Sequence, residues 1–408
     1  MPPSDANIES AIERAGKWLL RNQDPERGGW AERKGDSPSA LNTAEVLLAL
    51  ISVRDKVRRA GGKIRAGAEF LVQQQTTEGP NAGAWERYVN GQPVCPDILR
   101  TSLAVEALTC ISEAAPLDGV YLGTRWLMEA RNSDGGWGMR PGAESDVLMT
   151  CFATSALLTV VEADAEDCEG VIRDALAFLV AAQRPSGSFD PEGSSCGIRT
   201  AYSALCLQRA ERCSLSVHAK AREDAVTWLE ENPTAAIKEI ELTIEIDPDR
   251  TRPHADYAFV FMTEAVVVRL LSESPDEQVR QGRLVREALE AMFRSMDPDG
   301  GFFGQRVFSW STARATYALG AARDSFDRFP EAPRLPAPQQ VGRELLLFGV
   351  LSLVAVFVLS ALGVFGPLQA VVVTFLVLAL LLAYGRLSEA GFVEVFKALW
   401  QGRGRDTA

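Results

Sequence analysis

The chain has 408 residues, of which 47% are hydrophobic and 24% charged, a composition typical of folded proteins and not of disordered ones. Its formal net charge is −12; the residues from Glu331 onward contribute +1, so residues 1–330 carry −13. So acidic a body argues against binding to a phosphate backbone, and no nucleic-acid partner is predicted. The seven cysteines form no Cys-x-x-Cys pair and are expected to be reduced core thiols in a cytosolic compartment.

Residues 1–327 contain an internal repeat. An apolar helix end is followed by a Gly-rich turn that carries an aromatic residue, and this phrase recurs. The turn aromatics are Trp30, Trp85, Trp137, Phe189 and Phe302, spaced by 55, 52, 52 and 113 residues. Because the last gap is about two periods long, one repeat is hidden in it.

A second recurring phrase, a helix that opens at threonine, locates the hidden repeat. The six threonines are Thr43, Thr101, Thr150, Thr200, Thr263 and Thr312. Each helix pair has one apolar face more than a lone hairpin can bury, so neighbouring pairs must stack. The pattern predicts an all-α fold, an (α/α)6 toroid of six helical-hairpin repeats with inner and outer helices. An open helical solenoid is the alternative.

The glutamine and Gly-aromatic phrases, Gln23 with Trp30 and Gln75 with Trp85 among them, resemble the QW repeats of squalene cyclases. The chain is therefore similar to the terpenoid cyclase and protein prenyltransferase superfamily over residues 6–325. The resemblance implies a toroid around a central cavity. It does not specify chemistry, because folds host many functions.

The catalytic acid of squalene-cyclase-like proteins lies in an Asp-x-Asp-Asp-Thr-Ala motif, and Asp97 and Asp146 keep only its first aspartate. The acid position, two residues before each threonine, is apolar throughout: Leu41, Leu99, Leu148, Ile198, Phe261 and Trp310. No recognisable catalytic motif remains, so whether the chain is an enzyme stays open. Asp97 and Asp146 are candidate catalytic residues, with helix caps as the alternative interpretation.

Histidine usage gives no sign of the zinc site that protein prenyltransferases use. The chain has two histidines, His218 and His254, and neither lies in a ligand phrase of that family. Zinc requires three or four convergent ligands, so no metal and no cofactor are predicted. His254 is a third candidate catalytic residue; the alternative is a loop or capping residue.

The positions around the threonines predict the lining of the central cavity. The residue two before each threonine lies about 200° around the helix from it, so this position faces the lumen if the threonine faces the outer helices. The predicted ligand-binding residues are Leu99, Leu148, Ile198, Phe261, Trp310, Arg100, Arg199 and Arg314. An apolar wall with a few cations suits an isoprenoid or lipid ligand. The alternative is that the aromatics fill the core and the arginines pair with Glu45, Asp97 or Asp146.

The fifth repeat contains an insertion at residues 236–256. Residues 238–246 alternate between polar and apolar side chains, which predicts a short strand or an extended flap. Such a segment can recruit a protein partner by strand addition or cover the cavity.

The C-terminal part is predicted to be a membrane anchor. Residues 328–342 form a Pro-rich linker, residues 343–386 a transmembrane helical hairpin, and residues 387–408 an amphipathic tail. The two apolar runs, 345–365 and 368–384, contain no charged residue, and the basic residues flank their outer ends. By the positive-inside rule, both the body and the tail are cytoplasmic.

Two functional hypotheses follow. In the first, a membrane-anchored toroid binds an apolar ligand, such as an isoprenoid or lipid, in its central cavity. In the second, a non-catalytic interaction module or membrane effector recognises a protein partner through the toroid rim or the 236–256 insertion. In both, the lipid bilayer is a partner.

Overall fold

The computed structural model describes residues 5–89, 92–111, 117–163, 167–189, 196–215, 218–237, 240–244, 257–280, 282–302 and 308–323. Contacts divide the chain into a unit of essentially residues 3–330 and a second unit, residues 331–408. Within the described residues, no helix has the length and apolar character needed to cross a membrane. The predicted linker, transmembrane hairpin and tail lie outside those residues and stay predictions.

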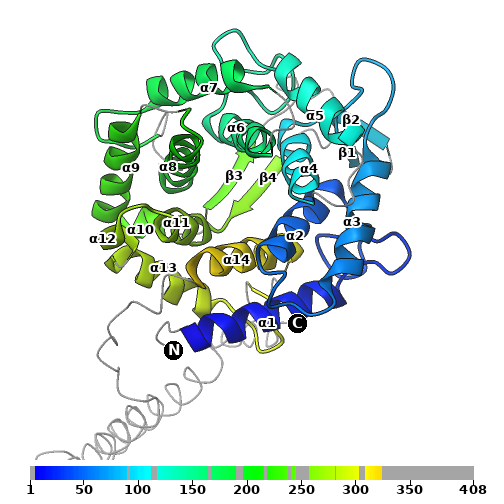
Figure 1. Cartoon of the computed structure of the whole chain (residues 1–408), viewed down its shortest axis with the longest axis horizontal. Helices are drawn as coiled ribbons and strands as arrows, with labels where there is room; N and C mark the ends of the chain where they lie inside the picture. The colour runs from blue at the N-terminus through cyan, green and yellow to red at the C-terminus, as the bar shows by residue number, and fades with distance from the viewer. Residues whose placement is uncertain are drawn as a thin grey trace, which may run out of the picture. The chain divides into compact units, whose positions relative to one another are not determined.

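The first unit is a ring of inner helices surrounded by outer helices (Figure 1). The inner helices in the described residues are α2 (Ala40–Ser52), α4 (Ile98–Cys110), α6 (Val147–Glu162), α8 (Cys196–Arg212), α11 (Thr263–Ser272) and α14 (Ser309–Ala322). The outer helices are α1 (Asp5–Arg21), α3 (Ala60–Gln74), α5 (Leu117–Glu129), α7 (Glu169–Ala182), α9 (Ala219–Glu231) and α13 (Arg283–Arg294). Two short helices, α10 (Pro233–Ala236) and α12 (Glu277–Arg280), join outer and inner positions.

The ring is closed. Each inner helix packs against the next, and the last, α14, packs against both α1 and α2. Polar contacts seal this junction: Trp18 Nε1 donates to Asp299 at 3.1 Å, and the Ser309 amide donates to the Glu32 carbonyl at 3.1 Å. Gly300, at φ 103°, lies so near the α1 backbone that a Cβ would come within 2.4 Å of the Arg14 carbonyl oxygen. The closed toroid is thus confirmed, and the open solenoid is wrong.

The recurring threonine holds the turn that precedes its helix. In five repeats, the threonine Oγ1 accepts a hydrogen bond from the backbone amide of the turn aromatic, at 2.9–3.1 Å. The three tryptophans also donate from Nε1 to a carbonyl at the end of the preceding outer helix, at 2.7–2.8 Å. All five aromatic side chains are fully buried. We call this repeated set of turn aromatics and threonines the belt.

Glutamines that end two of the outer helices link them to the next outer helix. Gln75 Nε2 donates to the carbonyl of Gly83 in its own turn, at 2.9 Å, and to that of Gly119 in α5, at 2.8 Å. Gln183 links its own turn to α9 in the same manner. The repeat phrase therefore encodes both the turn and the stacking of neighbouring repeats.

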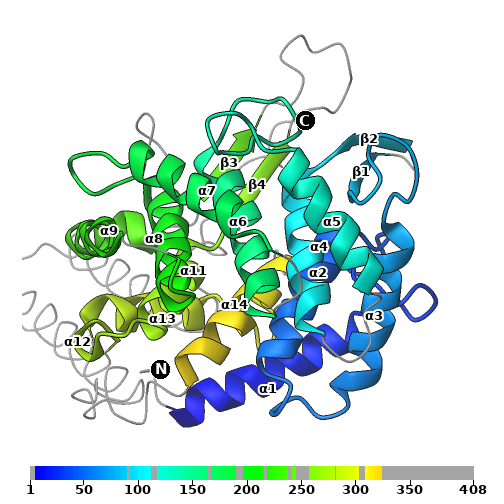
Figure 2. The same cartoon turned by 45° about the horizontal axis from the view of Figure 1, so that its top comes forward.

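The fifth repeat lacks the turn aromatic and has a β-hairpin in its place. Strands β3 (Ile240–Ile244) and β4 (Tyr257–Phe261) pair antiparallel, which confirms the strand predicted from the alternating pattern. Thr263 begins α11 directly after this hairpin, and its buried Oγ1 has no hydrogen-bond partner in the described part of the chain. The hairpin is drawn inside the ring outline in Figure 1 and toward one end of the ring in Figure 2.

A second antiparallel hairpin, β1 (Glu86–Val89) with β2 (Gln92–Pro96), precedes α4. The sequence patterns did not predict it, so the expected all-α class is wrong in this detail: the fold is a helical toroid with two hairpins. Both hairpins directly precede the N-terminal end of an inner helix. They therefore belong to the same end of the toroid, opposite the end where the inner helices terminate.

Candidate functional site

The two aspartates that resemble part of a cyclase motif are helix caps. Asp97 accepts a hydrogen bond from the Arg100 amide at the start of α4, and Asp146 accepts from the Leu148 and Met149 amides at the start of α6. A side-chain oxygen at this position satisfies amides that the helix leaves unpaired. The capping interpretation is confirmed.

The three arginines predicted to line the cavity pair with acidic neighbours. Arg100 pairs with Asp97, Arg199 Nη2 lies 3.0 Å from Asp146 Oδ2, and Arg314 Nη2 lies 2.5 Å from Glu45 Oε1. These are the three carboxylates that the alternative interpretation named. Arg100 and Arg199 thus help to hold the aspartates at the helix starts, while Arg314 ties α14 to α2 across the junction that closes the ring.

The predicted apolar lining is mostly enclosed by protein. Leu99, Leu148 and Ile198 have no exposed surface, and Trp310 stacks on Phe308 with ring centroids 5.9 Å apart. Phe261 ends β4, where it pairs with Ile240, and its side chain lies outside the described residues, as does His254. Among the described residues that line the central cavity, neither Asp97 nor Asp146 is present.

The described central cavity lies deeper along the inner helices. Its volume is about 60 Å³. Five inner helices each contribute two lining residues, which stand two and five positions after the repeated threonine. Arg269 and Ala313 complete the lining. The lining residues are Glu45, Leu48, Leu103, Glu106, Phe152, Ser155, Tyr202, Leu205, Arg269, Ala313, Arg314 and Tyr317. Of the predicted ligand-binding residues, Arg314 is the one that lines it.

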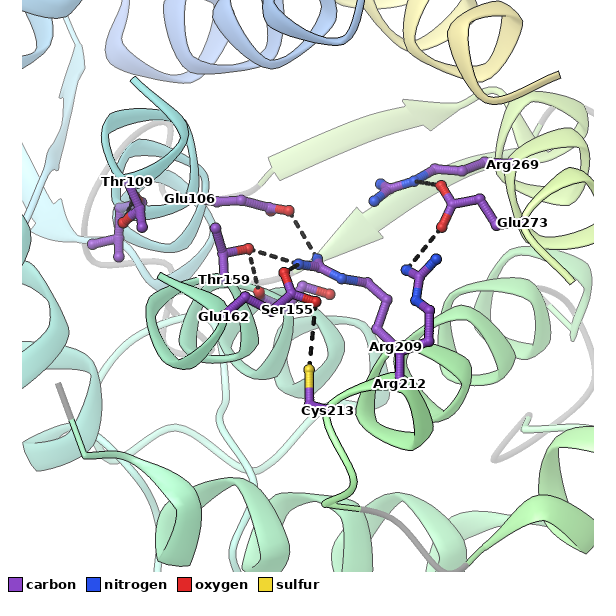
Figure 3. A network of polar contacts seen from close by, with 11 residues as sticks. Glu106, Thr109, Ser155, Thr159, Glu162, Arg209, Arg212, Cys213, Arg269 and Glu273 are labelled. Atoms are coloured by element: carbon purple, nitrogen blue, oxygen red, sulfur yellow. Dashed lines mark hydrogen bonds and ion pairs between the residues drawn. The ribbon is translucent and has the colours of Figure 1, made fainter. Parts of the chain in front are cut away.

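A network of ion pairs joins inner helices near their C-terminal ends (Figure 3). Arg209 of α8 pairs with Glu106 of α4 at 2.9 Å and with Glu162 of α6 at 3.2 Å, and donates to Thr159 at 2.7 Å. Since α6 lies between α4 and α8 in the ring, the Arg209–Glu106 pair joins two inner helices that are not direct neighbours. Both of these residues are buried.

A second branch of the network surrounds Glu273, at the end of α11. Its carboxylate accepts from Arg269 Nε and Arg212 Nη2, each at 3.0 Å. Arg269 also places its guanidinium over the Tyr317 ring, with Cζ 4.1 Å from the centroid, a favourable cation–π geometry. Burial opposes ionisation of Glu273, but the two arginines outweigh it and hold its pKa below the ordinary value.

Burial disfavours ionisation of the tyrosines and cysteines near the network. It raises the pKa of the Tyr202 and Tyr317 hydroxyls. It raises the pKa of the Cys110 thiol to about 12, with Glu106 adding to the effect, and that of Cys213 to about 11, with Glu162 adding to it. Both cysteines are therefore thiols at neutral pH, and neither is an activated nucleophile.

The charged side chains of this network are arranged as ion pairs. Each of its carboxylates is engaged by arginine. Within the described ranges, no group of three or more His, Cys, Asp or Glu side chains is placed to hold a metal ion. His218 precedes α9 as its N-cap residue without a side-chain capping bond.

The sequence patterns missed Glu106, Arg209, Arg269 and Glu273, and a positional signal was present for Glu106 alone. Positions facing the lumen fall at a fixed offset from each threonine, and charged residues at that offset are unusual in an apolar inner helix. A register analysis of the second and fifth positions would have identified Glu45, Glu106 and Arg314.

The fold and its belt define this unit as an α/α toroid. Residues 35–203 match the squalene-hopene cyclase C-terminal domain family. A drimenyl diphosphate synthase from Streptantibioticus cattleyicolor is 29% identical over 195 residues, which are 47% of this chain and 34% of that protein. The match thus spans about a third of the relative's length.

Solved structures share the architecture. The type II terpene cyclase MstE from Scytonema superimposes with a TM-score of 0.53 at 16% identity, covering 79% of this chain and 100% of that chain. An α-1,6-mannanase of Salegentibacter superimposes with a TM-score of 0.54 at 10% identity, covering 78% and 99%. Because the second protein's substrate is a sugar polymer, the shared toroid indicates fold and not chemistry.

Proposed function

We propose that this protein is a non-catalytic binding module built on a cyclase-type toroid and held at a membrane by its C-terminal apolar runs. The observation that supports this most directly is the lumen. Its described cavity is about 60 Å³, and Glu106, which lines it, is held in a buried ion pair with Arg209. Small-molecule sites usually enclose about 300–1,000 Å³, so the cavity lined by the described residues is smaller than an isoprenoid site requires.

The chemistry of the lumen points the same way. Proton-initiated cyclisation needs a protonated acid in a dry, apolar cavity. The positions at which the family resemblance would place that acid include the buried side chains of Leu99, Leu148 and Ile198. The lumen carboxylates Glu45 and Glu106 are each engaged in an ion pair with arginine.

The end of the toroid that carries the hairpins is the proposed surface for a protein partner. In the described residues, β3 pairs only with β4, so each strand has an edge whose backbone groups face no further strand. An unpaired edge is a template for strand addition by a peptide. The 236–256 insertion replaces the repeated turn at this end of the ring, so it is the part of this surface that the other repeats do not share.

A product assay tests the non-catalytic part. The full chain, purified in mild detergent, is incubated with farnesyl or geranylgeranyl diphosphate, and extracts are analysed by gas chromatography with mass spectrometry. We expect no cyclised product, and no lipid that co-purifies above background in native mass spectrometry. A cyclised product that disappears in Asp146→Asn would overturn the proposal.

Site-specific photo-crosslinking tests the binding surface. A photoreactive amino acid replaces Thr243 in β3, and a matched variant carries it at Tyr121, which is 45% exposed on α5. We expect one defined protein adduct from position 243 in cells that produce the protein natively, and none from position 121. The same adducts from both positions would contradict recognition by the hairpin.

A second candidate function is conversion or binding of an isoprenoid diphosphate. It is favoured by the match of residues 35–203 to the cyclase family and by the drimenyl diphosphate synthase relative. It requires the hairpin and the lumen network to rearrange and open the bore. A product or a bound isoprenoid in the assays above would support this function over the first.

A further inference from the structure

The segment that joins α2 to α3 and forms the start of α3 is positively charged, unlike the toroid as a whole. Residues 54–65 contain six basic residues and one acidic residue, whereas residues 1–330 together carry −13. Two of these seven charges form ion pairs with other parts of the chain. Arg323 Nη1 donates to both carboxylate oxygens of Asp55 at 2.8 Å, and Lys56 Nζ donates to Glu9 Oε1 at 2.5 Å. The segment is therefore a concentrated cationic site on an acidic protein.

Four of its arginines line an open groove of about 630 Å³. Arg54, Arg58, Arg59 and Arg65 are exposed, and none of their guanidinium groups has an ion-pair partner within the part of the chain that the structure describes. Ile51, Ile64, Cys110 and Ile111 supply an apolar side of the same groove. We call this feature the arginine groove.

The groove lies at the end of the toroid where the described chain leaves it. It surrounds the C-terminal ends of α2 and α4, and α14 ends in the same direction at Ala322. The next residue, Arg323, binds Asp55 beside the groove. The sequence that continues from this point contains the two apolar runs, 345–365 and 368–384.

We infer that the arginine groove binds the phosphate headgroups of anionic phospholipids at the membrane surface. This inference rests on the membrane association included in the proposed function. Guanidinium groups bind phosphate oxygens in bidentate geometry, and clusters of basic residues next to a membrane segment are attracted to anionic lipids. The isoleucines beside the arginines match the apolar part of a lipid below its headgroup, which a free phosphate does not have.

Hydrogen exchange in nanodiscs tests this inference on the full chain. The protein is placed in discs of phosphatidylcholine alone or in discs with added phosphatidylglycerol, and exchange of the amides of residues 54–65 is measured by mass spectrometry. We expect exchange about five-fold slower in the anionic discs, since the contact is electrostatic. The difference should shrink as the salt concentration rises.

The test variant is Arg54→Gln, Arg58→Gln and Arg65→Gln together. It leaves Arg59 in place, because that residue has a left-handed backbone with φ 66°. The matched control is Arg173→Gln with Lys220→Gln, which removes exposed cations from the outer helices α7 and α9. The difference between discs should vanish in the first variant and persist in the second.

Three outcomes would overturn the inference: equal exchange in both discs, a difference that survives in the groove variant, and protection in neutral discs on adding inorganic phosphate. The last would assign the groove to a soluble anion. Co-elution with neutral discs reports separately on the anchoring. Failure to co-elute with neutral discs, together with co-elution with anionic discs that is lost in the groove variant, would support lipid binding by the arginine groove and contradict the proposed membrane anchor.

Discussion

The belt and the lumen of this toroid are built on opposite principles. The belt uses the same bond in five repeats: a threonine hydroxyl accepts from the amide of a buried aromatic residue. The lumen has no such shared bond, and its ion pairs join different helices in different ways: Arg209 and Glu106 come from α8 and α4, and Arg314 and Glu45 from α14 and α2. Repetition thus secures the architecture, whereas the non-repeating positions give this toroid an interior unlike the open cavity implied by the family resemblance.

The largest expected effect comes from breaking the belt. Trp137 is fully buried, and its Nε1 donates to the Leu127 carbonyl at 2.7 Å. Trp137→Ala leaves a cavity and removes this bond, so we expect a loss of about 3–5 kcal/mol in the free energy of unfolding. Urea unfolding followed by circular dichroism measures it. Tyr121→Ala, on the exposed outer face, is the control, and an equal loss in both variants would contradict the role of the belt.

Breaking the lumen network should have the next largest effect. Arg209→Met leaves the buried Glu106 carboxylate without its arginine, and loss of one member of a buried ion pair costs about 3 kcal/mol or more. The same unfolding experiment measures this loss.

The double variant Glu106→Leu with Arg209→Met sharpens the result. It removes both charges and replaces them with apolar groups, which is often close to neutral for a buried pair. We expect the double variant to be more stable than Arg209→Met alone. If its loss equals or exceeds the sum of the two single losses, the two residues do not act as a pair.

A smaller effect distinguishes the regular repeats from the fifth. Thr150→Val removes the acceptor for the Trp137 amide while keeping the shape of the side chain, and should cost about 1–2 kcal/mol. The matched variant is Thr263→Val, since the Thr263 hydroxyl has no hydrogen-bond partner in the described residues. It should leave stability unchanged or raise it. Equal losses would show that the threonine frame has a role other than the bond to the turn.

The belt was predictable from sequence because one residue type performs one task at each turn. The threonine frame located all six inner helices, including the one that begins at Thr263 without its aromatic turn. The alternation in residues 238–246 likewise predicted β3. The reason for the threonine, a hydrogen bond to the turn, was not visible in the spacing itself.

The lumen was predictable only in part, because its contacts depend on which helices face each other. The caps Asp97 and Asp146 follow from local position, and the pairing of Arg100 with Asp97 is a contact within one turn. Arg209 and Glu106 are separated by 103 residues and meet because α4 and α8 flank α6 in a closed ring. No local pattern carries that information.

The smallest expected effect is a pH dependence that the lumen has and the belt lacks. The pKa of Glu273 is lower than the ordinary glutamate value of 4.5 because Arg269 and Arg212 outweigh the cost of its burial. A carboxyl shifted downward stabilises the fold above its unfolded pKa, and this contribution is lost as the pH falls through the folded pKa. Thermal unfolding should therefore show that Glu273→Gln lowers the melting temperature at pH 7 by more than at a pH well below 4.5. Glu129→Gln, which breaks the exposed pair with Arg125 on α5, is the control and should change the melting temperature little at either pH. If Glu273→Gln lowers the melting temperature equally at all pH values, the loss comes from packing and not from the ion pair.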